Sequence, residues 1–218
     1  MPTGKLQEIP YDRRAANRLI ADAGGMGRGL LTERRATAFF ASELASLRMA
    51  RVARPIADKI DAGETLTRSD AASFSARMRR EIATANLAAT RVLLPGEPSK
   101  RDRERLDAEI QRQYQFLDGF LRDLREGGRT GAEVAARASL YGSAVWGVAQ
   151  EVTRGRMADD GYGFERSCLA VTEHCPSCID RAVRGWSPIG TLPRLGDSEC
   201  RARCKCTWLY RRTDPDAD

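Results

Sequence analysis

The chain has 218 residues, of which 42% are hydrophobic and 30% are charged, and its formal net charge at pH 7 is +6. This size and composition predict one moderate domain, or one domain with an appendage, that can build an apolar core. No apolar run approaches the ~20 residues of a membrane span, and residues 1–12 lack the pattern of a secretory signal. We therefore expect no membrane contact and a reducing compartment, in which cysteines stay reduced or bind metal.

The positive charge comes mainly from arginine and gives an isoelectric point of about 9.2. A net positive charge of this size permits association with nucleic acid or with an acidic protein surface. Because arginines and acids are interleaved along the helical segments, we interpret most of this charge as solvated helix faces.

Residues 1–31 are expected to form a flexible arm that includes a short helix near Tyr11 to Ala21. The glycine-rich run at residues 24–29 follows no strand and lacks a Gly-Lys-Ser/Thr sequence, so it matches neither nucleotide-binding fingerprint. We interpret this run as a hinge, or as part of an arm that becomes ordered on a partner.

Residues 32–160 are predicted to form an α-helical domain. The first helix begins at Thr32 and ends at Gly63, and Pro55 is expected to kink or break it. The apolar residues that recur at helical spacing, and that should form its buried stripe, are Phe40, Leu44, Leu47, Ile56 and Ile60.

The second helix is expected from Thr67 to Leu94, and Thr67 and Asp70 resemble a capping box at its start. The turn at residues 95–98 ends it. Its expected buried face consists of Phe74, Met78, Ile82, Ala85, Ala89 and Val92.

The third helix is expected from Ser99 to Glu126, and the fourth begins at Thr130, where Thr130 and Glu133 match a capping box in full. The apolar stripe of the third helix is Leu106, Ile110, Leu117, Phe120 and Leu124. That of the fourth is Val134, Ala138, Tyr141, Val145, Val148 and Val152, and it fades between residues 157 and 163. Four striped helices joined by short turns predict a helical bundle or an elongated helical array.

The hydrophobic period changes after Gly163, and residues 165–172 and 205–211 have the composition of strands. The predicted fold is therefore mainly α, with an N-terminal helical bundle or array followed by a small β-hairpin module at residues 164–212. The acidic tail at residues 213–218 is expected to be disordered.

Five of the six cysteines lie in two close groups, Cys175 and Cys178, then Cys200, Cys204 and Cys206, which residues 179–199 separate. This spacing is typical of a structural zinc site, in which four ligands surround the ion with Zn–S distances near ~2.3 Å. The intervening sequence is rich in glycine and proline and has few large apolar residues, so a module this small needs a metal or disulfides. We predict a structural zinc ion bound by Cys175, Cys178, Cys200 and Cys204.

The sequence leaves the ligand set partly open. If residues 205–210 form a strand, Cys204 and Cys206 point to the same face, so Cys206 is an alternate ligand. His174, the only histidine, is a further candidate, but five thiols are better spaced. Cys168 is expected to pack as a small apolar residue on the preceding strand.

Two other uses of these cysteines remain open. In an oxidising compartment they would form disulfides. The Cys-x-x-Cys pair is also the thioredoxin-type redox motif, but that motif needs a strand–turn–helix setting in a βαβ unit, which the sequence does not show.

The order and spacing of several segments resemble the C-terminal part of the tailed-phage head morphogenesis family, the minor head proteins similar to protein F of phage Mu. The segments that carry the resemblance are residues 135–141, 173–178, 185–193, 200–206 and 210–211. In that family the second cysteine group commonly reads His-Pro-x-Cys-Arg-Cys. Here Cys200 stands about where the histidine would, with one extra residue, and Lys205 replaces the arginine. The family's ligand pattern thus carries onto Cys175 and Cys178, and onto the second group only as a choice among its three cysteines.

The resemblance implies a structural minor head protein of a tailed phage that acts in head morphogenesis, at or near the portal and the capsid interior. It implies the portal protein or the major capsid protein as partners, with packaged DNA and self-association as further contacts. The expected location is the virion, and the host cytoplasm during assembly.

Two other function classes are weighed against this one. A nucleic-acid-binding zinc protein is the alternative, because Arg201, Arg203 and Lys205 belong to a basic cluster near Trp186 and Trp208, and basic residues with aromatics can hold phosphates and stack bases. An enzyme is disfavoured, because a catalytic zinc keeps an open position and the cysteine pattern differs from that of the zinc deaminases. We therefore expect no catalytic residues.

Overall fold

The computed structural model describes residues 33–169, 174–197 and 199–213. The expected N-terminal arm with its short helix, and residues 214–218 of the acidic tail, lie outside the described residues. Among the described helices, none combines the length and the apolar character that a membrane crossing requires.

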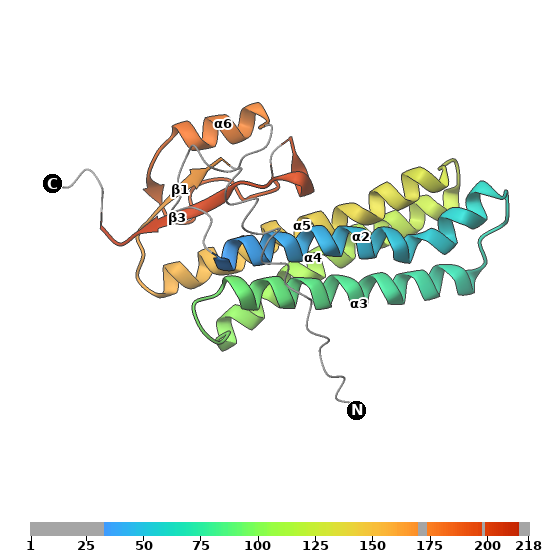
Figure 1. Cartoon of the computed structure of the whole chain (residues 1–218), viewed down its shortest axis with the longest axis horizontal. Coiled ribbons are helices and arrows are strands. Elements are labelled where there is room, and N and C mark those ends of the chain that lie inside the picture. The colour runs from blue at the N-terminus through green and yellow to red at the C-terminus, as the bar shows by residue number, and fades with distance from the viewer. Residues whose placement is uncertain (1–32, 170–173, 198, 214–218) are drawn as a thin grey trace.

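Four long helices run antiparallel to their neighbours in sequence and form the body of the molecule (Figure 1). They are α2 (Glu33–Asp61), α3 (Arg68–Leu93), α4 (Lys100–Glu126) and α5 (Gly131–Asp159). The first three all pack against α5. A small antiparallel sheet with a cysteine cluster follows at the C-terminal side, so the predicted mainly α fold with a small C-terminal β module is confirmed.

Side-chain caps define where three of these helices begin. The hydroxyls of Thr67, Ser99 and Thr130 accept from the backbone N–H three residues later, and Asp70, Asp102 and Glu133 complete capping boxes. A cap of this kind contributes about 1 kcal/mol to helix stability. The capping boxes predicted at Thr67 and Thr130 are confirmed.

The predicted apolar stripes of α4 and α5 are buried along their whole length, and that of α3 is buried or partly buried. Phe120 of α4 lies at the centre of this core, with its ring edge-on to Phe74 and stacked on Tyr141. The helical body is therefore held by one continuous apolar core.

The predicted stripe of α2 is wrong at two positions, because Leu44 and Leu47 are 37% and 67% exposed. The face that packs on α5 carries mostly small residues, among them Ala38, Ser42 and Ala45. A Cβ atom added to Gly142 of α5 would lie 2.1 Å from the backbone nitrogen of Ser46. Helices this close leave no room for leucine side chains between them, so small residues form the contact and the leucines lie on the flank.

We expected a kink or a break at Pro55; helix α2 continues through it to Asp61, so the break does not occur. Proline lacks the N–H that would bond the carbonyl of Arg51. Pro55 and Arg51 are both exposed, so water can satisfy that carbonyl, and the buried Val52, Ala53, Ile56 and Ala57 hold the helix on the core.

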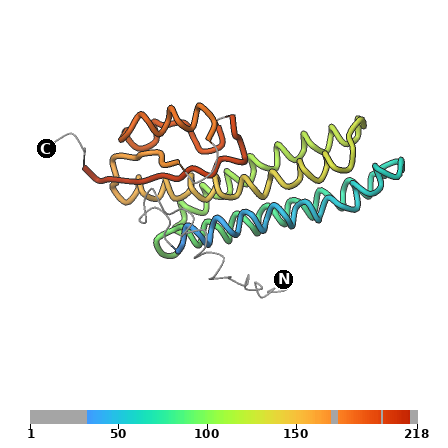
Figure 2. Tube along the Cα trace, turned by 45° about the horizontal axis from the view of Figure 1, so that its top comes forward, coloured from blue at the N-terminus to red at the C-terminus, as the bar shows by residue number. Residues whose placement is uncertain are grey.

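The C-terminal module contains the strands β1 (Phe164–Cys168), β2 (Ser187–Pro188) and β3 (Thr207–Arg211), helix α6 (Pro176–Val183) and the 3-10 turn η1 (Arg201–Arg203). The sheet order is β2-β1-β3 and both pairings are antiparallel, with Phe164 opposite Arg211. Strand β3, which follows the second cysteine group, thus pairs with β1, which precedes both groups. Figure 2 shows the module lying along the second half of α5.

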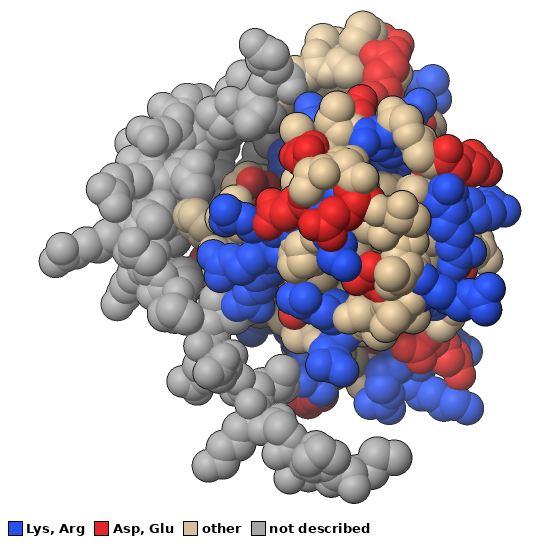
Figure 3. Space-filling model, turned by 90° about the vertical axis from the view of Figure 1, so that its right-hand side faces the viewer, with Lys and Arg blue, Asp and Glu red and all other residues tan. Residues whose placement is uncertain are grey.

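Charged side chains of both signs are interspersed on the face seen in Figure 3, which looks along the bundle from the end remote from the module. Arg54 and Asp58, and Lys100 and Glu104, are exposed pairs one helical turn apart. The interleaved charge thus lies on solvated helix faces, as the sequence predicts.

Candidate metal centre

Five cysteines from three segments converge in the module. Cys175 is the N-cap residue of α6 and Cys178 lies in its first turn. Cys200 precedes η1 and Cys204 follows it, while Cys206 lies directly before β3. The fold of the module therefore brings the two cysteine groups to one place.

The sulfur atoms form two overlapping groups that share Cys178, one with Cys175 and Cys200 and the other with Cys204 and Cys206. Within each group all sulfur atoms lie within 4.8 Å of one another. The Cys178 sulfur lies 3.5 Å from that of Cys200 and 3.8 Å from that of Cys204. Tetrahedral Zn–S bonds of ~2.3 Å would separate two sulfurs by ~3.8 Å, so the donor set fits a thiolate-bound metal ion.

Hydrogen bonds within the cluster favour the thiolate, the form that binds metal, at Cys204 and Cys175. The hydrogen bond from the Cys206 thiol, which outweighs burial, lowers the pKa of Cys204 to about 4. The same hydrogen bond, with burial, raises the pKa of Cys206. Burial raises the pKa of Cys175, but hydrogen bonds from the backbone N–H groups of Cys200 and Cys178 more than offset it and bring the value to about 7.

Arg181 of α6 is buried against the sulfur cluster. Its guanidinium donates to the sulfur of Cys178 at 3.3 Å and lies 3.8 Å from that of Cys204. It also donates to the carbonyls of Pro193 and Arg194, at 3.1 and 2.9 Å. A single side chain thus offsets thiolate charge and ties α6 to the loop before the second cysteine group.

Trp208 of β3 joins the cluster to the helical body. It is fully buried, and the guanidinium carbons of Arg154 and Arg181 lie 4.7 and 5.6 Å from its ring centroid. Arg154 of α5 also forms a buried, bidentate pair with Glu165 of β1 and donates to the carbonyl of Leu192 at 2.8 Å. The sheet is therefore bound to α5 by an ion pair that is out of contact with water.

Other side chains of α5 bond directly to the strand that follows the cysteines. The Trp146 indole N–H donates to the carbonyl of Cys206 at 2.8 Å. The amide oxygen of Gln150 accepts from the hydroxyl of Thr207 and the backbone N–H of Trp208, at 3.2 and 3.4 Å. The strand that follows the cysteines is thus hydrogen-bonded directly to a helix of the body.

All four predicted ligands, and the alternate Cys206, belong to the cluster. Cys168 is the last residue of β1, half-buried and outside both sulfur groups. His174 belongs to neither group of ligand atoms found among the described residues. None of the six cysteines, all of which are among the described residues, forms a disulfide.

The three predicted nucleic-acid-binding residues have different surroundings. Lys205 forms an ion pair with Glu43 of α2 at 2.5 Å, and its ammonium lies 5.0 Å from the ring centroid of Phe39. Arg201 and Arg203 lie exposed on η1. Of these three, only the two arginines present a free face to a phosphate backbone.

Sequence reasoning missed Arg154, Glu165 and Arg181 as residues of the site. All three side chains are buried, but in the sequence they look like the many other charged residues of the chain. Arg181 lies three residues after Cys178 in the sequence, and Glu165 lies ten residues before Cys175, but no local pattern separates a buried charge from a solvated one.

Cys175 lies at the start of a helix, which is where a thioredoxin-type pair also lies. The sheet of the module is antiparallel throughout the described strands, whereas the redox motif belongs to a βαβ unit with parallel strands. Cys178 is 1% exposed, and three further thiols surround the pair. The arrangement therefore favours metal binding over disulfide exchange.

Comparisons of the chain with protein-family models, with curated proteins and with solved structures gave no match.

Proposed function

We propose that the chain is a structural minor head protein of a tailed phage, and that one structural zinc ion, held by four of the five clustered thiols, stabilises its C-terminal module. The observation that carries the metal assignment is the convergence of Cys175, Cys178, Cys200, Cys204 and Cys206 around a shared sulfur. The segments that resemble the head morphogenesis family support the assignment to the phage head.

Zinc is the metal that this donor set favours. Thiolates select zinc, copper(I) or iron–sulfur clusters, and tetrahedral all-sulfur sites are typical of zinc or iron. Structural zinc sites are four-coordinate and closed, whereas catalytic sites keep a position for water. The hydrogen bonds from Arg181 to two of the sulfurs are the kind of contact that orients metal ligands. A surplus of thiols supports a structural role.

In head assembly the protein would act through its surfaces. Buried contacts fix the module to α5, and the metal would hold the segments of the module together. The module would then be a rigid surface for contact with the portal or the capsid interior. The helical body adds a long surface, on which the exposed Leu44 and Leu47 of α2 are candidates for a protein contact.

Two experiments test the two parts of this proposal separately. Native mass spectrometry of the reduced, full-length protein should find one zinc ion per chain, and chelation should remove it together with thermal stability. A metal-free chain that is folded, with its cysteines oxidised in pairs, would exclude the zinc site. Deletion of the gene from a producing phage should lower particle yield, and heads that assemble and infect normally without this polypeptide would exclude the head function.

A further inference from the structure

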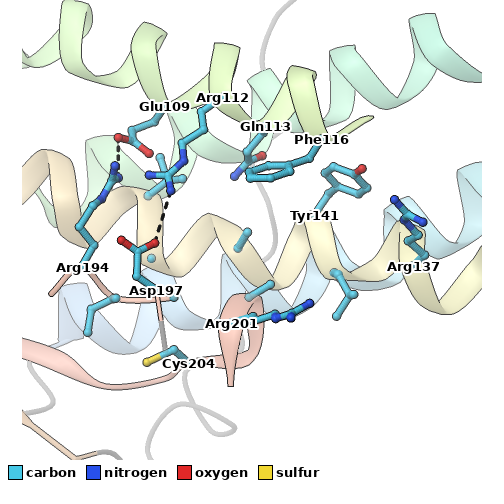
Figure 4. Close-up of a pocket in the computed structure, with 17 residues that line it drawn as sticks. Glu109, Arg112, Gln113, Phe116, Arg137, Tyr141, Arg194, Asp197, Arg201 and Cys204 are labelled. Carbon is cyan, nitrogen blue, oxygen red and sulfur yellow. Dashed lines mark hydrogen bonds and ion pairs between the residues drawn. The ribbon is translucent and has the colours of Figure 1, made fainter. Parts of the chain in front are cut away.

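A groove of about 780 Å³ lies between α4, α5 and the loop that carries η1 (Figure 4). Its floor is apolar and consists mainly of residues of α5. The apolar lining residues are Phe116, Leu140, Tyr141, Ala144, Val148 and Leu195. The volume lies in the range of ordinary ligand and peptide pockets.

Arginines lie at both ends of the groove. At one end Arg194 pairs with Glu109 at 2.5 Å, and Arg112 pairs with Asp197 at 3.4 Å (Figure 4). Arg137 lies toward the opposite end and Arg201 projects from the η1 side (Figure 4). Four guanidinium groups and two carboxylates line the groove. Arg137 also pairs with Asp123, which lies outside the lining, so Arg201 supplies the positive charge that has no ion pair among the described residues.

Three side chains in the lining lack the contacts that such groups usually have. Phe116 is 61% exposed beside the groove. Gln113 is 6% exposed and lines the groove, and its amide nitrogen has no hydrogen-bond partner among the described residues. Arg201 is exposed and forms no ion pair with the part of the chain that the structure describes. An apolar ring, an amide donor and a guanidinium together suit a ligand with carboxylates and small apolar groups.

We propose that this groove binds the acidic segment at residues 213–218 of a second copy of the chain. That segment reads Thr-Asp-Pro-Asp-Ala-Asp, so three carboxylates alternate with Pro215 and Ala217. In an extended chain successive side chains point to opposite sides. The proline and alanine would therefore face the apolar floor, while the carboxylates face the arginines of the rim.

The segment cannot reach the Arg137 end of the groove in its own molecule. Arg212 donates to the carbonyl of Asp160 at 2.7 Å, so the segment begins at the C-terminal end of α5. Arg137 lies 23 residues earlier, from 137 to 160, which is ~34 Å along a helix. Six extended residues span only ~20 Å, so a segment that fills the groove as far as Arg137 must come from a second molecule.

A contact between one end of a molecule and a groove elsewhere on its neighbour is heterologous. Such contacts build rings or open filaments, whereas a two-fold dimer joins identical surfaces. This self-association goes beyond the proposed function and does not depend on the phage assignment.

The first test is a peptide with the sequence of residues 212–218, blocked at both ends, whose binding to the full-length protein is followed by fluorescence anisotropy. It should bind, and a peptide with the three aspartates replaced by asparagine should not. Arg201→Asp should weaken binding at least roughly tenfold, the loss expected for a charge-assisted hydrogen bond. Aspartate is tolerated at the positive φ of 45° that Arg201 adopts, so this variant should fold.

A matched control separates the groove from the general charge of the module. Arg184 is also exposed, at the end of α6, and does not line the groove. Arg184→Asp changes the net charge by the same amount and should leave peptide binding unchanged. A peptide with Asp214→Arg and Asp216→Arg should recover binding to the Arg201→Asp protein.

The second test is sedimentation velocity of the full-length chain over a range of concentrations. Reversible self-association should appear, should weaken with salt, and should vanish when residues 214–218 are deleted. The proposal is overturned if the chain stays monomeric up to about 1 mM, because a dissociation constant above this concentration describes an interaction too weak to matter. If the chain stays monomeric but the peptide still binds to it, the groove binds an acidic segment of a different protein. Equal effects of Arg201→Asp and Arg184→Asp overturn it as well.

Discussion

The helical body and the C-terminal module are held together by different forces. The body has a continuous core of apolar side chains from α2 to α5, and burying one large side chain of this kind contributes about 1.5–3 kcal/mol. The buried core of the module consists of Cys178, Leu192, Leu195, Cys204, Cys206 and Trp208. Half of these residues are cysteines, so the module has little apolar burial of its own.

Helix α5 connects the two regions. One side of it carries the apolar stripe of the bundle, and further along it Trp146, Gln150 and Arg154 bond to the module. The comparison teaches that the module, unlike the body, depends on a preformed helix on which to lie, and we propose that a bound metal ion is its second support. Variants that remove the sulfur cluster or the contact with α5 should affect the module first, whereas variants in the core and the caps should affect the body.

The largest effect is expected from Cys178→Ser, because Cys178 belongs to both sulfur groups. Metal binding to such modules contributes about 10–16 kcal/mol, so loss of the ion should disorder the module while the bundle remains helical. Metal content, far-ultraviolet circular dichroism and hydrogen exchange at residues 199–213 measure the two regions separately. Cys168→Ser, outside both groups, is the control and should keep the metal. Unfolding of bundle and module together would show that the body depends on the metal too.

In the body, Phe120→Ala should lower the free energy of unfolding by about 3–5 kcal/mol, because it leaves a cavity in a packed core. Phe120 is fully buried between Phe74 and Tyr141. Phe116, about one turn earlier, is 61% exposed, so Phe116→Ala should change stability by no more than about 0.5 kcal/mol. Urea unfolding measures both variants. Similar losses from the two would contradict the core as described.

At the junction, Arg154→Leu should lower stability by about 3 kcal/mol, because it leaves Glu165 buried without its ionic partner. The double variant Arg154→Leu with Glu165→Leu should recover much of this loss, since apolar replacement of a buried pair is often neutral. A double-mutant cycle in urea measures the coupling. We also expect the single variant to separate the unfolding of the module from that of the bundle, and one shared transition would argue against α5 as the support.

The smallest effect concerns a surface cap of the body. Hydrogen bonds from Lys59 and from Thr67 lower the pKa of Asp70 from 3.8 to about 2. A lowered carboxyl pKa stabilises the fold above pH 3.8, and that contribution is lost as the pH falls through about 2. A carboxyl titration by NMR should place the midpoint near 2, and Lys59→Met should move it upward. A midpoint that Lys59→Met leaves in place would mean that Thr67 alone holds the carboxylate.

Much of the fold was predictable because its signals are local. The capping boxes at Thr67 and Thr130 connect residues three apart, and the stripes of α4 and α5 repeat within a few turns. The α2 stripe failed because its burial depends on Gly142, almost a hundred residues away, which brings the two helices too close for Leu44 and Leu47. The break that was expected at Pro55 as the alternative to a kink does not occur for a similar reason, since the packing on both sides of Pro55 holds the helix together.

Some features of the candidate metal centre were likewise predictable from the sequence, and others were not. Cysteine spacing alone indicated which thiols could gather, because short loops between ligands constrain where each sulfur can go. It could not indicate that Arg181 would be buried beside Cys178, or that Arg154 would reach Glu165. A charged side chain is buried only when distant segments supply its partners, and that depends on how the module lies on α5. Local sequence therefore accounts for the helices and the metal-binding pattern, and long-range packing accounts for the buried charges and for the groove between α4, α5 and η1.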